Sequence, residues 1–136
     1  MTEQDKQLLI KDLSARLPYG VMIQIPELFY PQRKVIEKLV TISDLWHFND
    51  DGVYIENVKP YFRPMSSMTE EEIKMFQEYG VNLIKQHNFD DSPLSNFYVM
   101  SLSLDWLNAH HFDYRGLIEK GLALEAPEGM YDIKSN

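Results

Sequence analysis

Apolar residues recur along the chain with two periods, and each change of period predicts a change of secondary structure. Residues 2–17 show the spacing of one helical face. Its members are Ile10, Leu13 and Leu17, with Leu9 beside them. Thr2 can cap this helix, and Pro18 ends it because proline disfavours helical geometry in the preceding residue. In residues 21–25, apolar types then alternate with Met and Gln, which predicts a strand.

The middle of the chain favours further strands. Residues 33–48 are rich in β-branched types, which indicates one long bent strand or two short ones. The turn-forming run 49–52 separates residues 45–48 from residues 53–55, and its Asp-Gly pair tolerates positive φ angles, so we expect a hairpin. A calcium loop is disfavoured there because alternating oxygen ligands ending in a glutamate are missing. Two prolines in residues 58–64 favour an extended course.

In the second half of the chain, the spacing of apolar residues predicts helices. Thr69 and Glu72 form a capping-box pattern that opens a helix, and Gly80 either ends this helix or is tolerated within it. A further helix, capped by Ser95 or Asn96, should stop near residue 110. The inward stripes are expected at Ile73, Phe76 and Tyr79 or Leu83 in the first helix, and at Phe97, Met100, Leu104 and Leu107 in the second.

A last short helix is predicted over residues 113–121. Asp113 can cap it, Phe112 and Leu117 can form a hydrophobic staple, and Gly121 marks its exit. Residues 127–136 then form a turn, followed by a short strand at residues 130–133 or a loose tail.

This order of elements predicts an α+β fold in a single domain covering residues 1–136. A helix comes first, then three or four strands, then three helices, so we expect a small antiparallel sheet packed with about four helices. The length of 136 residues suits one hydrophobic core.

The composition narrows the classes of function. Thirteen basic residues face 21 acidic ones, for a net charge of −8, which disfavours general nucleic-acid binding. The chain has no cysteine, so thiolate catalysis and cysteine-ligated zinc are excluded. The polar start differs from a secretory signal, and no apolar run reaches the ~18 residues of a membrane span. We therefore expect a cytoplasmic protein with no membrane contact.

One group of residues invites a metal hypothesis. His110, His111 and Asp113 supply imidazole and carboxylate groups that suit zinc or iron, as in a small metal-dependent hydrolase. Adjacent helical side chains point about 100° apart, however, so both histidines could serve one ion only beyond the end of the helix. The favoured interpretation is that a histidine lies at the negative end of the helix and Asp113 caps the next element. No cofactor is expected.

Complete catalytic motifs are missing from the sequence. Asp105, His110 and Asp113 with Ser101 or Ser103 could form a hydrolytic triad, but the chain lacks the Gly-x-Ser-x-Gly elbow. Phosphate-loop and dinucleotide fingerprints are missing as well. An enzyme is therefore the minority hypothesis.

The run 59–64 is the better candidate for an interaction surface. Its prolines stiffen the backbone, and aromatic and arginine side chains are enriched at the centres of interfaces. The candidate residues are Lys59, Tyr61, Phe62 and Arg63, joined with lower weight by Tyr114 and Arg115. In the alternative interpretation, Tyr61 or Phe62 fills the junction between sheet and helix, Tyr114 packs at a corner, and Arg115 pairs with a nearby carboxylate.

Three segments together resemble a known group of proteins. They are residues 11–21 (KDLSARLPYGV), 58–71 (VKPYFRPMSSMTEE) and 112–118 (FDYRGLI). They are similar to a family of small uncharacterised proteins from gut Bacteroidales and from their phages and mobile elements. The resemblance implies an accessory protein inside a cell, with no catalytic residue to transfer.

The sequence thus favours a non-catalytic protein-interaction or accessory factor of phage, mobile-element or bacterial origin. Its partner would be another protein or a second copy. The alternatives are the metal-dependent hydrolase and a nucleic-acid ligand or acidic nucleic-acid mimic.

Overall fold

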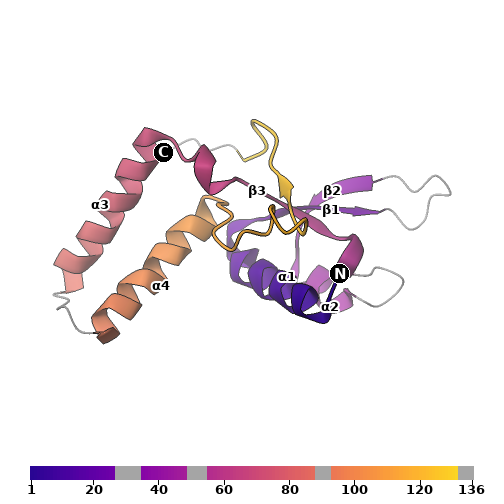
Figure 1. The fold of residues 1–136 in the computed structure, drawn as a ribbon, viewed down its shortest axis with the longest axis horizontal. Coiled ribbons are helices and arrows are strands. Elements are labelled where there is room, and N and C mark those ends of the chain that lie inside the picture. Colours follow the sequence, from indigo (N-terminus) through magenta and orange to yellow (C-terminus); the bar gives the residue numbers. More distant parts are fainter. Residues whose placement is uncertain (27–34, 49–54, 88–92, 132–136) are drawn as a thin grey trace.

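The protein folds as a sheet-and-helix body from which a pair of long helices extends. The computed structural model describes residues 1–26, 35–48, 55–87 and 93–131. Figure 1 shows the sheet with helices α1 and α2 on one side, and helices α3 and α4 lying side by side beyond it. The expected α+β class is confirmed.

Four strands form one mixed sheet in the order β2-β1-β3-β4. Strand β1 (Met22–Pro26) pairs antiparallel with β2 (Val35–Leu39) and with β3 (Lys59–Phe62). Strand β4 (Leu124–Glu125) runs parallel to β3, so the prediction of a purely antiparallel sheet is wrong at this edge. The chain returns to β3 only after both long helices, and such a return allows a parallel strand.

Helix α1 (Glu3–Arg16) begins at the predicted cap, but the predicted cause of its end is wrong. Leu17 keeps right-handed helical angles before Pro18, and residues Leu17–Tyr19 continue as a 3₁₀ turn that ends at Gly20, whose φ angle is 78°. The Thr2 side chain accepts a hydrogen bond from the Asp5 amide, and Asp5 returns the bond to Thr2 as in a capping box. The expected stripe is wrong in part, because Ile10 is exposed. The buried face consists of Leu9, Asp12, Leu13 and Arg16, the i, i+3, i+4, i+7 set that includes a charged pair.

The prediction of a hairpin around residues 49–52 is wrong where the structure describes it. Residues Ile42–His47 form helix α2, and residues Ile55–Asn57 form a 3₁₀ turn, while residues 49–54 lie outside the described part. Thr41 and Asp44 make a second capping box. This local cap overrides the β propensity of the neighbouring residues. Within the described part of the predicted strand region, residues 35–39 form a strand.

The two long helices are confirmed, with corrections to their faces. Helix α3 (Glu70–His87) starts at the Thr69–Glu72 capping box and runs through Gly80. Helix α4 (Pro93–Ala109) ends as expected, but it begins at Pro93, so Ser95 and Asn96 lie inside it and the predicted cap is wrong. Ile73 is 42% exposed, Met100 65% and Leu104 37%, so these three do not belong to an inward stripe.

The short helix predicted over residues 113–121 does not form. These residues make successive turns, because Gly116 inside the predicted span adopts a φ angle of 72°, which a right-handed helix cannot contain. The strand expected at residues 130–133 is also absent from its described part, residues 130 and 131. Residues 132–136 lie outside the described part.

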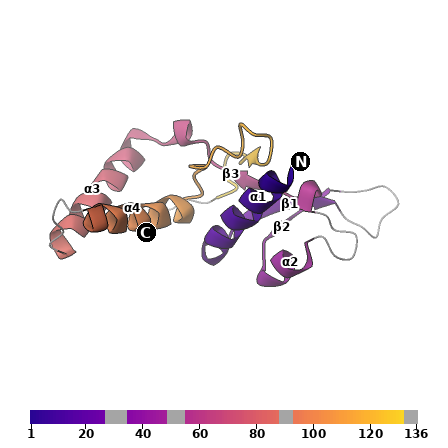
Figure 2. The same cartoon turned by 60° about the horizontal axis from the view of Figure 1, so that its bottom comes forward.

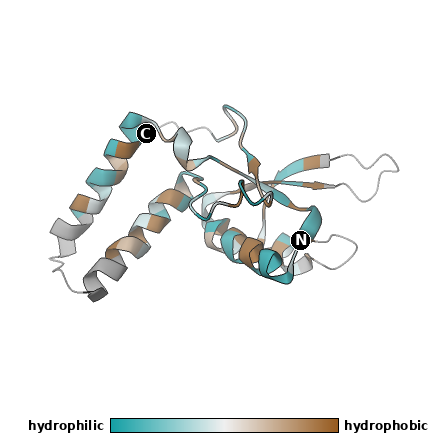
Figure 3. Ribbon diagram, viewed as in Figure 1, coloured by the Kyte–Doolittle hydropathy of each residue, from teal (hydrophilic) through white to brown (hydrophobic). Residues whose placement is uncertain are grey.

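The core divides into two apolar clusters. The larger joins α1 to the sheet and includes Leu9, Leu13, Ile23, Phe62 and Leu117. The smaller lies where α3 and α4 meet the sheet body and contains Trp106, Leu107 and Phe112, with Phe76 and Tyr79 packed against them. Figure 3 shows apolar positions on α1 and the strands and also along α3 and α4, and Figure 2 shows the helical pair standing clear of the sheet in a second view. Within the described residues, no helix is both long and apolar enough to cross a membrane.

Candidate functional site

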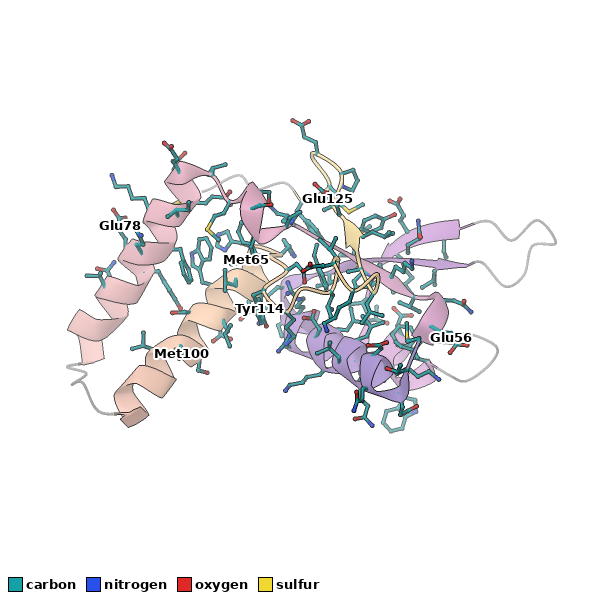
Figure 4. All side chains as sticks on the ribbon, in the orientation of Figure 1. Glu56, Met65, Glu78, Met100, Tyr114 and Glu125 are labelled. Carbon is teal, nitrogen blue, oxygen red and sulfur yellow. The ribbon has the colours of Figure 1, made fainter. Side chains whose placement is uncertain are left out.

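The charged residues of greatest interest meet at residues 110–121, which we call the corner segment. It follows α4 and lies between the helical pair and the sheet body, where Figure 4 labels Tyr114. Its backbone extends the sheet, because the Arg63 amide donates to the His111 carbonyl at 2.8 Å and the Asp113 amide donates to the Arg63 carbonyl at 2.9 Å. The corner segment therefore pairs with the chain at the end of β3, beyond the residues of β3 that pair with β1.

Asp12 is the centre of a buried ion network. Its carboxylate accepts from Arg16 Nε at 2.6 Å and from Arg115 Nη1 at 2.8 Å. The side chains of Asp12 and Arg16 are fully buried, and that of Arg115 is 20% exposed. The network ties helix α1 to a segment about a hundred residues later. Removing Asp12 would leave the buried charge of Arg16 without compensation, which is costly.

Arg16 also holds the corner segment through its backbone and ring contacts. Its Nη2 donates to the Phe112 carbonyl at 2.6 Å. The guanidinium lies 4.1 Å from the Phe62 ring centroid and 5.0 Å from that of Tyr114. Cation–π contacts of a desolvated arginine are among the stronger ones. Arg16 is thus a structural centre, and its Nη1 is buried without a hydrogen-bond partner in the protein.

A second charged pair joins β3 to α3. Arg63 donates from both terminal nitrogens to the two Glu72 oxygens, at 2.8 and 2.7 Å, and lies over the Phe112 ring at 4.2 Å. These hydrogen bonds from Arg63 hold the pKa of the Glu72 carboxyl below its usual value. Because Glu72 also accepts from the Thr69 amide, the helix cap and the ion pair share one carboxylate.

The side chains predicted as possible metal ligands make other contacts in the structure. His110 stacks on Trp106 with ring centroids 3.9 Å apart, and its Nδ1 lies 2.8 Å from the Trp106 carbonyl. The carboxylate of Asp113 accepts from the amides of Leu117 and Ile118. Among the described residues, no group of three histidine or acidic side chains is arranged to hold a metal ion.

His111 occupies a strained backbone position in the same segment. Its φ angle is 65°, and its ring stacks on Tyr131 with centroids 3.7 Å apart. Burial, followed by the charges of Arg16, His110 and Arg63, lowers the pKa of His111 to about 4. At neutral pH the imidazole is therefore uncharged, and its Nδ1 is buried without a hydrogen-bond partner in the protein.

The phenol of Tyr131 closes a gap in the sheet. Strands β1 and β3 pair at Ile23 and Pro60 but separate at the next position. There the Tyr131 hydroxyl accepts from the Met22 amide at 3.0 Å and donates to the Tyr61 carbonyl at 2.7 Å. Burial raises the pKa of Tyr131 to about 12, so the hydroxyl keeps the proton that it donates.

The interaction residues predicted in β3 lie mostly inside the molecule. Phe62 is fully buried in the core, and Tyr61 is 6% exposed, with its hydroxyl donating to Glu37 and accepting from Gln24. Arg63 is held by Glu72, and Lys59 is partly buried in the strand. A partner could touch Phe62 only if the core opened. Their placement favours the alternative in which this segment fills the junction of sheet and helices.

Tyr114 and Arg115 also make internal contacts. The Tyr114 hydroxyl donates to Asn108 at 2.8 Å, and Arg115 pairs with Asp12. A hollow of about 230 Å³ lies beside the end of β3 and the residues that follow β4. It is lined by residues 63, 64, 67, 125–129 and 131. Its arginine is neutralised by Glu72, so it offers no unpaired cation to a ligand.

Ser103 cannot serve as the imagined nucleophile in this conformation. Its hydroxyl donates to the Val99 carbonyl one turn earlier, at 2.8 Å. Asp105 is exposed on α4, while Asp113 is buried and bonded to backbone amides. The described side chains therefore do not form a triad.

Helix α2 presents an apolar outer face that the sequence reasoning did not predict. Ile42 is 71% exposed and Trp46 is 79% exposed, and their i, i+4 spacing puts them on one side of the helix. Leu45 lies on the other side and packs against the main core. The sequence does contain a signal for this helix, because Thr41 and Asp44 have the spacing of a capping box. When residues 42–47 form a helix, their apolar side chains fall on two sides of it.

The predictions from sequence also missed the buried ion network, although its spacing is visible in the sequence. Asp12 and Arg16 lie at i+3 and i+7 from Leu9, inside the apolar stripe of α1, and this spacing was available from the sequence. No pattern indicates Tyr131, because its partners are backbone groups of distant strands.

Comparison with known proteins gives no match for this chain, whether against protein-family models, curated proteins or solved structures.

Proposed function

We propose that this protein is a non-catalytic accessory factor that acts by binding another protein through the outer face of α2. The exposure of Trp46 and Ile42 carries the proposal. A largely exposed tryptophan presents roughly 200 Å² of mostly apolar surface, and tryptophan is the residue type most enriched at interface hot spots. Such a side chain is unfavourable in water unless a partner covers it.

The use of the charged side chains supports the same proposal. Asp12 pairs with both Arg16 and Arg115, Arg63 pairs with Glu72, and Asp113 satisfies backbone amides. These contacts join α1, β3, α3 and the corner segment, and so they stabilise the fold. The resemblance of three segments to proteins of Bacteroidales and their phages supports an accessory role in that setting.

Site-specific crosslinking in the native host tests the proposal. A photoreactive residue replaces Trp46 in one variant and Ser66, which is exposed on the 3₁₀ turn Met65–Ser67, in a control. We expect a defined protein adduct from position 46 and not from position 66. The identified partner is then titrated against purified protein.

The binding measurement decides the outcome. The Ile42→Ser/Trp46→Ser variant should bind the partner at least 10-fold more weakly, because two anchors are lost. Tyr19→Ser, a control at another exposed aromatic, should bind as the unmodified chain does. Equal affinity of the Ile42/Trp46 variant, with unchanged circular dichroism, would reject the α2 face.

A further inference from the structure

Residues 127–131 form a turn that lies against the corner segment and reaches back to the sheet. Figure 1 shows this turn in yellow, beyond β4. The Met130 amide donates to the Pro127 carbonyl at 3.1 Å, and residues 127–129 are exposed. Just before the turn, the Ala126 amide donates to the Phe62 carbonyl at 2.8 Å. The turn is therefore fixed to the sheet by Ala126 at one end and by Tyr131 at the other.

The Tyr131 hydroxyl stands between two backbone groups of the sheet. Strands β1 and β3 run antiparallel, and Met22 faces Tyr61 one position beyond the residues that pair. The Met22 amide and the Tyr61 carbonyl are joined through the phenol, at 3.0 and 2.7 Å. A buried backbone donor or acceptor needs a partner, so these two groups depend on a side chain that the turn supplies.

The ring of Tyr131 covers His111, which lies among cations from three elements. The two ring centroids are 3.7 Å apart. Burial lowers the pKa of His111 most, and the charges of Arg16 on α1, His110 in the corner segment and Arg63 at the end of β3 lower it further. A proton on this imidazole is therefore unfavourable as long as Tyr131 stays in place.

The acidic groups of the surrounding elements are engaged elsewhere or exposed. They are Asp12 on α1, Glu72 on α3, Asp113 in the corner segment, and Glu125 and Glu128 beside the turn. The first two pair with arginines, the third accepts from backbone amides, and the last two lie at the surface. The charges that act on His111 within the described residues are therefore positive.

We infer that residues 127–131 form an acid-released latch on the sheet. When His111 takes up a proton, Tyr131 leaves both the imidazole and the two backbone groups, water reaches the charged ring, and the rest of the fold remains closed. The latch swings about the Ala126–Pro127 link, because Ala126 stays bonded to β3.

The latch moves in preference to His111 because the backbone of His111 is held on both sides. The Arg63 amide donates to the His111 carbonyl at 2.8 Å, and the His111 amide donates to the Asn108 carbonyl at 3.1 Å. The latch keeps its internal hydrogen bond when it swings out, so release breaks the two hydrogen bonds of the Tyr131 hydroxyl and the ring stack. Exposed segments of this kind open locally at a lower free energy than a buried core does.

The size of the response follows from the pKa of His111 in the two states. That pKa is about 4 beneath Tyr131 and 6.5 when the ring is open to water. Between these values the released state binds a proton and the latched state does not, so release becomes more favourable as the pH falls. The ratio of released to latched protein should rise about 20-fold between pH 7 and pH 5.

Amide hydrogen exchange of the full chain, followed by NMR over a series of pH and urea values, tests the latch. The Met22 amide donates to Tyr131 and should exchange through a local opening that hardly depends on urea. After correction for the intrinsic exchange rate, this opening should become about 20-fold more frequent from pH 7 to pH 5. The Val40 amide, which donates to the Val21 carbonyl between β1 and β2, should exchange more slowly and with the full urea dependence of unfolding.

Two histidine variants separate the latch from general effects of acid. His111→Asn should lose the pH response at Met22, because asparagine tolerates a positive φ angle and does not titrate. His110→Gln is the matched control and should keep most of the response. Should His111→Asn fail to fold, the pH and urea series on the unmodified chain still decides the outcome.

Three results would overturn the inference. The first is exchange at Met22 with the same opening free energy and urea dependence as at Val40, because the latch would then open only on complete unfolding. The second is a local opening whose frequency does not change with pH. The third is a pH response that persists in folded His111→Asn. These measurements do not involve the outer face of α2, so they are independent of the proposed function.

Discussion

The phenol ring of Tyr131 lies flat against the imidazole of His111, with centroids 3.7 Å apart and planes 9° from parallel. His111 reaches this position because its backbone adopts a φ angle of 65°, which is uncommon for any residue except glycine. Tyr131 in turn bridges the backbones of β1 and β3. The stack therefore connects the strained corner segment to the point where the sheet splits.

This stack predicts a specific dependence of stability on pH. The pKa of His111 is about 4 in the folded protein and 6.5 in the unfolded chain. As the pH falls from 6.5 to 4, His111 binds a proton in the unfolded chain but not in the folded protein, so the free energy of unfolding decreases. The expected loss is roughly 3 kcal/mol, at 1.4 kcal/mol per unit of pKa difference. Urea denaturation at intervals across this range measures it.

His111→Asn is the matched variant, because asparagine tolerates positive φ but does not titrate. Its unfolding free energy should stay nearly constant between pH 6.5 and pH 5. Both proteins should weaken below about pH 4.5, where Glu72, whose carboxyl pKa is lowered by Arg63, is protonated preferentially in the unfolded chain. An unchanged slope in the variant would show that His111 is not the titrating group.

Removing the Tyr131 hydroxyl should destabilise the sheet without altering the ring stack. In Tyr131→Phe, the Met22 amide and the Tyr61 carbonyl lose their shared partner in a partly buried place. We expect a loss of about 1–3 kcal/mol by denaturant titration. Faster hydrogen exchange at the Met22 amide would locate the effect, whereas exchange at the wild-type rate would contradict the bridging role.

The Asp12 network predicts a larger effect. Asp12→Asn keeps the shape of the side chain but leaves the fully buried Arg16 without a counter-charge, so a loss of about 3–5 kcal/mol is expected. Arg115→Gln removes the 20% exposed partner and should cost much less. Replacing Asp12 and Arg16 together by Leu and Met should recover stability relative to Asp12→Asn. A double variant weaker than Asp12→Asn would mean that packing, and not the buried charge, dominates this site.

Local signals explain what the sequence could predict about the fold. The caps at Thr2 and Thr69 and the alternation in β1 all act within a few residues, and each was confirmed. The errors arose where two local signals competed. At residues 42–47 the Thr41 cap and the β-branched composition disagreed, and the cap prevailed because it satisfies amides that a strand would leave to a neighbour.

The site depends on contacts that no local pattern contains. Arg115 was expected to pair with a nearby carboxylate in one interpretation, but no local pattern identifies that carboxylate as Asp12 on the first helix, which Arg115 reaches because the chain turns at Gly116. Likewise, the segment 59–63 has the composition of an interface, yet it became the central strand because the corner segment and β4 both pair with it. Composition identifies aromatic and basic residues, and only topology decides whether they face solvent.

Substitutions at Gly80 and Gly116 test whether the turn in the corner segment depends on the positive φ angle of a glycine. Gly80 lies inside α3 with open space where a Cβ would be added, so Gly80→Ala should stabilise the protein by up to about 1 kcal/mol. Gly116 also has open space, but its φ angle of 72° is strained for any residue with a Cβ, so Gly116→Ala should destabilise by about 1–2 kcal/mol. Thermal and urea unfolding of the two variants provide the comparison. If Gly116→Ala were neutral, residues 113–121 would be able to adopt the right-handed helix that their sequence pattern favours, and the turn that places Arg115 beside Asp12 would not depend on this glycine.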